Sequence, residues 1–135
     1  MIKKSFNVEI YYEDTDFSGA VYHANYFKFI ERARSKIIEN IGIDQLTLQK
    51  KNSIFVVSSL SARFIRPAFF GDIVQVNTNF LTIGGASILL EQKILKQKES
   101  IFVAKVRLAF VSEGKPERLP SLIRQKLLNS DHVLS

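Results

Sequence analysis

The sequence predicts a two-layer α+β domain in which one long amphipathic helix covers an antiparallel sheet. Between residues 26 and 41, apolar residues recur at three- and four-residue steps, as on one face of a helix. Several later segments alternate apolar and polar residues, as strands do, and turn residues separate them. Consecutive strands of this kind form an antiparallel sheet whose apolar face is available to the helix.

The elements before the sheet can be read in chain order. Residues 6–12 are rich in β-formers and predict a first strand. A turn follows, and the helix then runs to about residue 41, with Asn25 as its N-cap and Gly42 as its stop. Residues 43–51 predict a short helical or irregular connection.

Four strands and a final helix complete the prediction. The strands cover residues 54–66, 73–83, 88–96 and 101–111, and Pro67 marks the end of the first of them. Gly84 and Gly85 predict a tight hairpin turn. Residues 119–128 predict a terminal helix, and the residues after it are expected to fray. Because such a sheet has a long edge, we expect a dimer that continues it.

Length and composition fit one globular domain over residues 1–135. The N-terminus lacks the apolar run of a signal peptide, and no segment approaches the roughly 20 apolar residues that cross a bilayer. A cytoplasmic location is therefore expected. The chain has no cysteine, which excludes disulfides and a cysteine nucleophile. Its net charge of +6 is spread along the chain, so it attracts anions without selecting one.

Chemically active side chains are concentrated in the turn before the helix. Asp14, Asp16, His23 and Asn25 lie within a few residues of one another, and Gly19 permits a tight or left-handed bend among them. Aspartates often bond the backbone N-H groups of turns, and we assign that role to Asp14. A carboxylate and a helix N-terminus are then expected to face the same space.

Two motifs stand out: Tyr12-x-Asp14-Thr15-Asp16-x-x-Gly19-x-Val21-Tyr22-His23-x-Asn25-Tyr26 and Phe64-Ile65-Arg66-Pro67-Ala68-x-x-x-Asp72. They resemble the signature of the 4-hydroxybenzoyl-CoA thioesterase-like family of hot-dog proteins. The Tyr-His order in the first motif is similar to that of the YbgC branch, which consists of bacterial acyl-CoA thioesterases associated with the Tol-Pal cell-envelope system. The resemblance implies a hot-dog fold, in which a curved antiparallel β-sheet wraps around a long central helix.

The resemblance also implies site roles. It aligns Asp16 with a catalytic carboxylate, which either attacks the thioester carbonyl or acts as a base toward water; the sequence leaves both routes open. Backbone N-H groups at the helix start, near His23, would receive the oxyanion. His23 and Tyr22 are further catalytic candidates. The substrate-binding candidates are Gly19, Val21, Asn25 and Arg66.

The sequence departs from the family at two places. The Phe17-Ser18 pair and Ala20 replace small residues common in relatives. Some relatives hold coenzyme A phosphates with basic residues after the third strand, but residues 82–87 contain none. Arg63, Arg66 and nearby lysines are the possible replacements.

Other functions compete with acyl-CoA hydrolysis. One is a noncatalytic scaffold that binds acyl groups or acyl carrier protein. A second is a divalent-metal site built from Glu13, Asp14, Asp16 and His23. Nucleic-acid binding is disfavoured because no basic stripe with interleaved aromatic residues is present.

The resemblance implies no cofactor, and it implies a homo-oligomer, as a dimer of dimers. The acyl-chain preference is left open.

Overall fold

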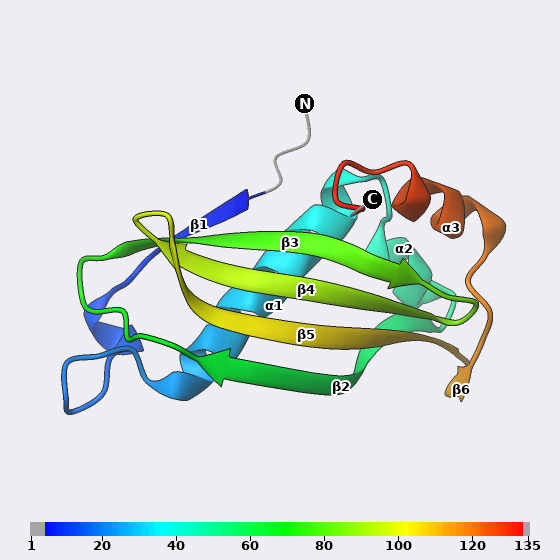
Figure 1. Ribbon diagram of the computed structural model, residues 1–135. Coiled ribbons are helices and arrows are strands. Elements are labelled where there is room, and N and C mark those ends of the chain that lie inside the picture. The colour runs from blue at the N-terminus through cyan, green and yellow to red at the C-terminus, as the bar shows by residue number, and fades with distance from the viewer. Residues whose placement is uncertain (1–4, 134–135) are drawn as a thin grey trace.

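The computed structural model describes residues 5–133, which form a curved sheet wrapped around one long helix (Figure 1). The predicted α+β architecture is confirmed. In chain order the elements are β1 (Ser5–Glu9), the 3-10 helix η1 (Tyr12–Asp14), α1 (His23–Asn40), α2 (Gln45–Lys50), β2 (Ser53–Phe64), β3 (Ile73–Ile83), β4 (Ser87–Lys96), β5 (Glu99–Ser112), β6 (Lys115–Pro116) and α3 (Ser121–Leu128).

The strands pair in the order β1-β3-β4-β5-β2, and β6 adds to β5. All of these pairings are antiparallel. The chain meanders through β3, β4 and β5, with the predicted hairpin at Gly84, whose N-H donates to Ser87 O at 2.8 Å. β2 does not pair with β3, the strand that follows it in the chain, but forms the edge beside β5. The start of α1 and the end of β2 consequently lie at the same end of the molecule (Figure 1).

The core lies between α1 and the inner face of the sheet. Tyr26, Phe29, Ile30, Ala33 and Ile37 form the buried stripe of α1, as the three- and four-residue spacing predicts. The inner face of β3, β4 and β5 carries buried apolar side chains, namely Val74, Val76, Phe80, Ile88, Leu90, Ile94, Phe102, Ala104, Val106, Leu108 and Phe110.

A buried polar network also crosses this core. The Gln92 amide on β4 donates to Ile30 O on α1 and to the Thr78 hydroxyl on β3, each at 2.9 Å. Its oxygen accepts a hydrogen bond from Arg34 at 3.0 Å. Burial lowers the pKa of Arg34, because desolvation disfavours the charged form. Since each group has a partner, the network fixes the position of α1 across the sheet.

Both ends of α1 have specific causes. Gly42 is in the left-handed conformation with φ +95, its N-H bonds Glu39 O, and the N-H of Ile43 bonds Ile38 O. This pair of bonds is a Schellman motif, so the predicted stop at Gly42 is confirmed. The predicted N-cap is wrong. Tyr22 occupies the N-cap position, and Asn25 lies inside the first turn of α1.

The first strand is shorter than predicted. It ends at Glu9, and Tyr11 and Tyr12 are exposed at the start of η1 instead of extending the strand. The cause is Asp14, whose carboxylate accepts a hydrogen bond from the N-H of Tyr11 at 2.9 Å. That contact turns the backbone away from the sheet.

The segment after α3 does not fray as far as Val133. His132 is fully buried, its carbonyl accepts from the N-H of Phe80 at 2.7 Å, and Val133 forms a parallel bridge with Phe80. The His132 ring bonds Thr78 O through Nδ1 at 3.0 Å. Residues 134–135, for which fraying was also predicted, lie outside the described residues.

Candidate active site

The loop between η1 and α1 is held by its own backbone and by one neighbouring segment. Asp16 N-H donates to Ala20 O at 2.9 Å, and Gly19 N-H donates to Asp16 O at 3.0 Å. Val21 N-H donates to Ala68 O at 2.9 Å. Gly19 has φ +88, a conformation that favours glycine. The predicted left-handed bend is therefore present.

Asp16 is exposed on this loop, and Ser18 binds its carboxylate twice. The backbone N-H of Ser18 donates to Oδ1 at 2.8 Å, and its hydroxyl donates to the same oxygen at 2.6 Å. These bonds lower the pKa of Asp16, and the nearby charge of His23 acts in the same direction. Asp16 is thus an ionised carboxylate at neutral pH.

Asp14 holds the loop against α1, which is the structural role expected for it. Besides bonding Tyr11, it offers its carbonyl oxygen to the N-H of Tyr22 and to the side-chain amide of Asn25, each at 2.9 Å. In the described part of the chain, the first two N-H groups of α1, on His23 and Ala24, donate no hydrogen bond. They are free donors at the positive end of the helix dipole.

A cavity of about 250 Å³ opens beside these donors. Aromatic rings pack around Phe64, one of its lining residues: between centroids, the Phe64 ring lies 5.7 Å from Tyr26, 5.1 Å from Phe102 and 6.2 Å from His23. Apolar and aromatic side chains thus share this cavity with the imidazole of His23 and the guanidinium of Arg66. It is lined by Val21, His23, Tyr26, Phe64, Ile65, Arg66 and Pro67.

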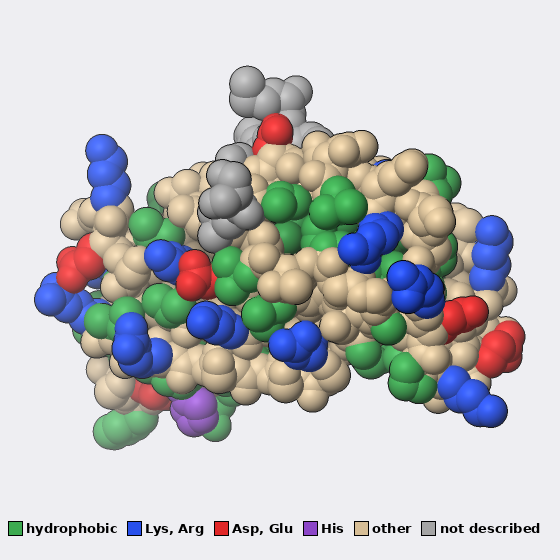
Figure 2. All heavy atoms as spheres, turned by 45° about the vertical axis from the view of Figure 1, so that its right-hand side comes forward, with side chains coloured by type: hydrophobic (Ala, Val, Ile, Leu, Met, Phe, Trp, Pro, Cys, Tyr) green, Lys and Arg blue, Asp and Glu red, His purple; other side chains and the backbone are tan. Residues whose placement is uncertain are grey.

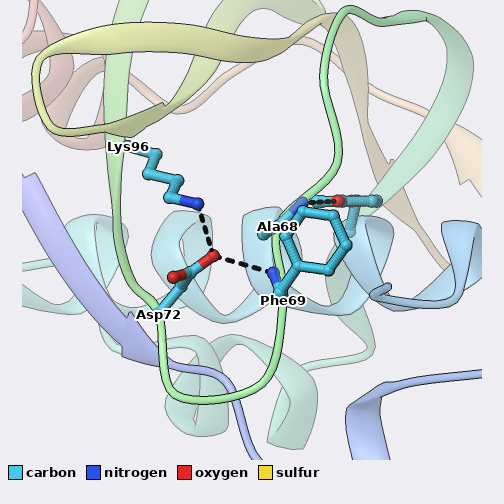
Figure 3. A network of polar contacts seen from close by, with 5 residues as sticks. Ala68, Phe69, Asp72 and Lys96 are labelled. Atoms are coloured by element: carbon cyan, nitrogen blue, oxygen red, sulfur yellow. Dashed lines mark hydrogen bonds and ion pairs between the residues drawn. The ribbon is translucent and has the colours of Figure 1, made fainter. Parts of the chain in front are cut away.

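The second family-like motif supplies the other wall of this cavity, and Figure 3 shows the turn that holds it. Ala68 N-H donates to the Tyr26 hydroxyl at 3.0 Å. The Asp72 carboxylate accepts from Phe69 N-H and pairs with Lys96, each at 2.8 Å. Partial burial opposes ionisation of Asp72, but the bonds from Lys96 and Phe69 outweigh it and lower the pKa of Asp72.

Tyr26 and Phe64 line the cavity although neither was predicted as a site residue, and the Phe102 ring packs against both. Tyr26 was predicted as a core residue, and it is buried, with its pKa raised by that burial. Phe64 and Phe102 were predicted only as strand residues. The available signal was the position of Phe64 at the start of the second motif.

Arg66 lines the cavity, and its guanidinium group already forms an ion pair. Its guanidinium pairs with Glu99 at 2.5 Å, and both side chains are largely exposed. A ligand phosphate would have to compete with that carboxylate.

A larger hollow, of about 550 Å³, lies at the far end of α1 and is lined by Glu39, Asp44 and neighbouring residues, with no histidine or arginine.

The residues predicted for the site thus divide into two groups, side by side at one end of the molecule. Those lining the cavity are Val21, His23 and Arg66. Those in the adjoining loop and first helical turn are Asp16, Gly19, Tyr22 and Asn25. The alternative metal site is not assembled: among residues 5–133, no three His, Asp or Glu side chains are placed to hold one metal ion.

Comparison with known proteins assigns the family. The profile of the Thioesterase-like superfamily matches residues 11–128, which include both motifs. The chain belongs to the thioesterase-like superfamily. This membership confirms the resemblance stated from the two motifs.

Curated relatives of this thioesterase-like chain carry a common name. The acyl-CoA thioesterase YbgC of Haemophilus influenzae is 38% identical over 112 residues, covering 82% of each protein. The acyl-CoA thioesterase YbgC of Helicobacter pylori strain 26695 is 30% identical over 132 residues, covering 90% of this chain and 96% of the relative.

Solved thioesterase structures share the fold. A probable thioesterase from Bartonella henselae superposes with a TM-score of 0.82 at 37% identity, covering 86% of this chain and 98% of that one. The 1,4-dihydroxy-2-naphthoyl-CoA thioesterase from Synechocystis has a TM-score of 0.86 at 18% identity, covering 95% and 97%, which shows the fold alone. The predicted hot-dog fold of this thioesterase-like chain is confirmed.

Proposed function

We propose that this protein is an acyl-CoA thioesterase, which hydrolyses acyl-CoA to the free acid and coenzyme A. One observation carries the proposal: the loop bearing an ionised Asp16 adjoins an apolar cavity and a helix N-terminus with free N-H donors. Hydrolysis of a thioester uses a nucleophile or base, a space for the acyl group and donors for the oxyanion, and these three features can supply them. The names of the YbgC relatives support the same activity.

Asp16 acts on the thioester carbonyl by one of two routes. As a nucleophile, it forms an anhydride while the C-S bond breaks and the coenzyme A thiolate leaves; water then hydrolyses the anhydride. As a general base, it takes a proton from water, whose oxygen attacks the same carbon; the C-S bond then breaks, the coenzyme A thiolate leaves, and the proton held by Asp16 is available to it. In both routes the carbonyl oxygen gains negative charge, and we assign its stabilisation to the N-H groups of His23 and Ala24.

Substitution of Asp16 tests this function. We expect Asp16→Asn to lower thiol release from acyl-CoA by about a hundredfold or more, which is a usual contribution of a general base. Asp131→Asn removes the same charge from an exposed position near the C-terminus and serves as the matched control. Circular dichroism verifies that each variant is folded. Equal turnover by wild type and Asp16→Asn would contradict the proposed role.

The side chain and the backbone of His23 can be tested separately. His23→Ala keeps the backbone N-H at the start of α1 and removes the imidazole from the cavity wall. If only the N-H serves the oxyanion, turnover at saturating substrate should change less than about threefold, whereas loss of an acid-base group costs about a hundredfold or more. Measurement of kcat for several acyl-CoA chain lengths decides between these roles.

A noncatalytic role is the second candidate function, and the net charge of +6 supports it, because that charge attracts anionic partners such as acyl carrier protein. Calorimetric titration separates the two functions. The scaffold role is correct if Asp16→Asn binds a nonhydrolysable acyl-CoA as tightly as wild type and neither protein releases thiol from ordinary acyl-CoA. Binding without turnover only in the variant supports the enzyme.

The remaining proposals concern assembly and setting. We assign the unpaired edge of β2 to a dimer contact that continues the sheet, and two such dimers to a tetramer.

Within residues 5–133 no helix has the length and apolar character needed to span a bilayer. We place the enzyme in the cytoplasm, in cell-envelope lipid metabolism linked to the Tol-Pal system, by analogy with the YbgC branch.

A further inference from the structure

Ser18 holds the Asp16 carboxylate by one of its two oxygens. Among residues 5–133, every hydrogen bond that reaches this carboxylate from another residue comes from Ser18, through its N-H at 2.8 Å and its hydroxyl at 2.6 Å. Both bonds end on Oδ1. The described residues therefore leave the lone pairs of Oδ2 available to a substrate or a water molecule.

The direction of the Ser18 hydroxyl is defined by its two partners. An ionised carboxylate only accepts hydrogen bonds, so the hydroxyl proton lies toward Asp16. The hydroxyl oxygen also accepts a bond from the N-H of Ala20 at 3.3 Å. A backbone group thus orients the hydroxyl, and the hydroxyl orients the carboxylate.

The loop around this contact is closed by its own backbone. The N-H of Asp16 donates to Ala20 O at 2.9 Å, and the N-H of Gly19 donates to Asp16 O at 3.0 Å. Ser18 therefore lies at a defined place relative to the Asp16 backbone. Because Asp16 is exposed, packing does not select its side-chain rotamer. The two hydrogen bonds from Ser18 select it instead.

We propose that Ser18 is a positioning residue for Asp16, whose hydroxyl occupies Oδ1 and holds the carboxylate in one rotamer with Oδ2 presented for the reaction. This inference rests on the proposed function of Asp16. It adds a residue to the site and assigns different roles to the two carboxylate oxygens. Ser18 itself neither accepts a proton from the substrate nor attacks it.

The contact has a measurable electrostatic consequence. A hydrogen bond donated to the ionised form favours that form, and the Ser18 bonds lower the pKa of Asp16. Ser18→Ala keeps the backbone N-H but removes the hydroxyl. The pKa of Asp16 should then rise toward its usual value, and the side chain should sample more than one rotamer.

The test combines a titration with kinetics. The Asp16 carboxyl carbon is followed by NMR from about pH 3 to about pH 7, around the usual carboxyl range, in wild type, Ser18→Ala and Ser18→Thr. Thiol release from acyl-CoA is measured on the same proteins. Ser121→Ala, at an exposed serine that begins α3, is the matched control.

We expect Ser18→Ala to titrate at higher pH and to lower kcat about two- to tenfold, the equivalent of one hydrogen bond, with KM nearly unchanged. Ser18→Thr restores the hydroxyl and should restore both values. An unchanged Asp16 titration in Ser18→Ala, or failure of Ser18→Thr to recover kcat, would overturn the inference.

Asp16→Asn, measured in parallel, separates this failure from failure of the proposed function. If Asp16→Asn turns over substrate as fast as wild type, the catalytic role of Asp16 is wrong, and the positioning role is lost with it. If Asp16→Asn is inactive while Ser18→Ala behaves like wild type in both assays, the function stands and the Ser18 inference alone is wrong.

Discussion

At the scale of single residues, Gly19 determines the path of the loop between Asp16 and α1. Its φ of +88 lies in the left-handed region, and a Cβ built there has no atom within 4 Å. The cost of a side chain at this position is therefore conformational and not steric. The same holds for Gly114, with φ +77, in the turn between β5 and β6.

These two glycines make a matched pair of substitutions. Gly19→Ala and Gly114→Ala should each lower the free energy of unfolding by about 1 kcal/mol, because each forces an alanine into the left-handed region. Only Gly19→Ala should also lower kcat, since it shifts the loop that carries Asp16. Urea denaturation and thiol-release kinetics on both variants check this prediction. Equal kinetic effects would contradict it.

Asp72 provides a pH-dependent contribution to stability at the turn behind the cavity. Its pKa is lower in the folded state than in the unfolded chain, owing to Lys96 and Phe69. The contribution is fully present above the usual aspartate pKa of about 3.9, and it is lost as pH falls through the lower folded value. Asp72→Asn should remove this part of the acid-induced loss of stability.

The same substitution has an effect at neutral pH. Asp72→Asn should lower the free energy of unfolding by about 1 kcal/mol, because charge-assisted hydrogen bonds become neutral ones. Chemical denaturation at several pH values measures both effects. Asp131→Asn changes the charge equally at an exposed site and is the control. A parallel decline of Asp72→Asn and wild type with falling pH would contradict the prediction.

Sequence patterns identified the chemical parts of the site better than the residues around them. Asp14 as a turn cap and Gly19 as a left-handed bend follow from local side-chain chemistry, and both are present. The contact of Tyr26 with Phe64 depends on where β2 ends relative to α1, and no local pattern encodes that. Asn25 was misassigned because its residue type suits an N-cap, whereas its amide instead bonds Asp14 O.

At the scale of elements, the segment after α3 completes the edge of β3. β1 pairs with β3 only from Ile73 to Asn77. Beyond that point, Phe80 N-H bonds His132 O and Thr78 O bonds the His132 ring. Two segments from opposite ends of the chain thus cover successive parts of one edge, which would otherwise expose unpaired backbone groups.

Substitution of His132 tests this closure. Because a carbonyl only accepts, Nδ1 of His132 carries the proton in its bond to Thr78 O. His132→Ala leaves that carbonyl unpaired and opens a cavity, so the free energy of unfolding should fall by about 2–4 kcal/mol. His132→Asn can keep a donor near the same place and should lose less. Urea denaturation of both variants decides.

Helices and strands were predictable to the extent that their causes are local. The apolar stripe from Tyr26 to Ile37 and the Gly42 stop require only neighbouring residues, and they agree with the structure. The pairing of β2 with β5 joins positions as distant as Ser53 and Ser112, so their register depends on the assembled sheet. The burial of His132 likewise depends on groups of β3 that β1 leaves unpaired.

At the scale of the whole molecule, the surface is mixed in charge and has an apolar edge. Figure 2 shows Lys and Arg distributed over one face among polar and hydrophobic groups, without a continuous basic stripe. Along β2, by contrast, apolar side chains are exposed: Ile54, Val57, Leu60 and Phe64. In the described residues, β2 pairs only with β5 and leaves its other edge free.

A charged residue on this edge tests the proposed dimer. Leu60→Lys should convert the dimer to a monomer, because a lysine on an edge strand opposes pairing between chains. Ser61→Lys adds the same charge at the next position, on the other face of the strand, and should disturb assembly less. Light scattering at micromolar protein measures the mass. A monomeric wild type would contradict the proposed assembly at once.

β1 and the segment after α3 lie along the same edge of β3, and this brings the two ends of the described chain close together. Ser5 is opposite Asn77, and Val133 forms a bridge with Phe80, so the two ends of the described chain lie about 10 Å apart along one strand, at about 3.3 Å per residue. A short linker could join them. New ends could open in the exposed turn at Gly114, at the end of the molecule away from Asp16. The architecture is therefore suited to circular permutation, with strand pairings and active-site loop kept intact.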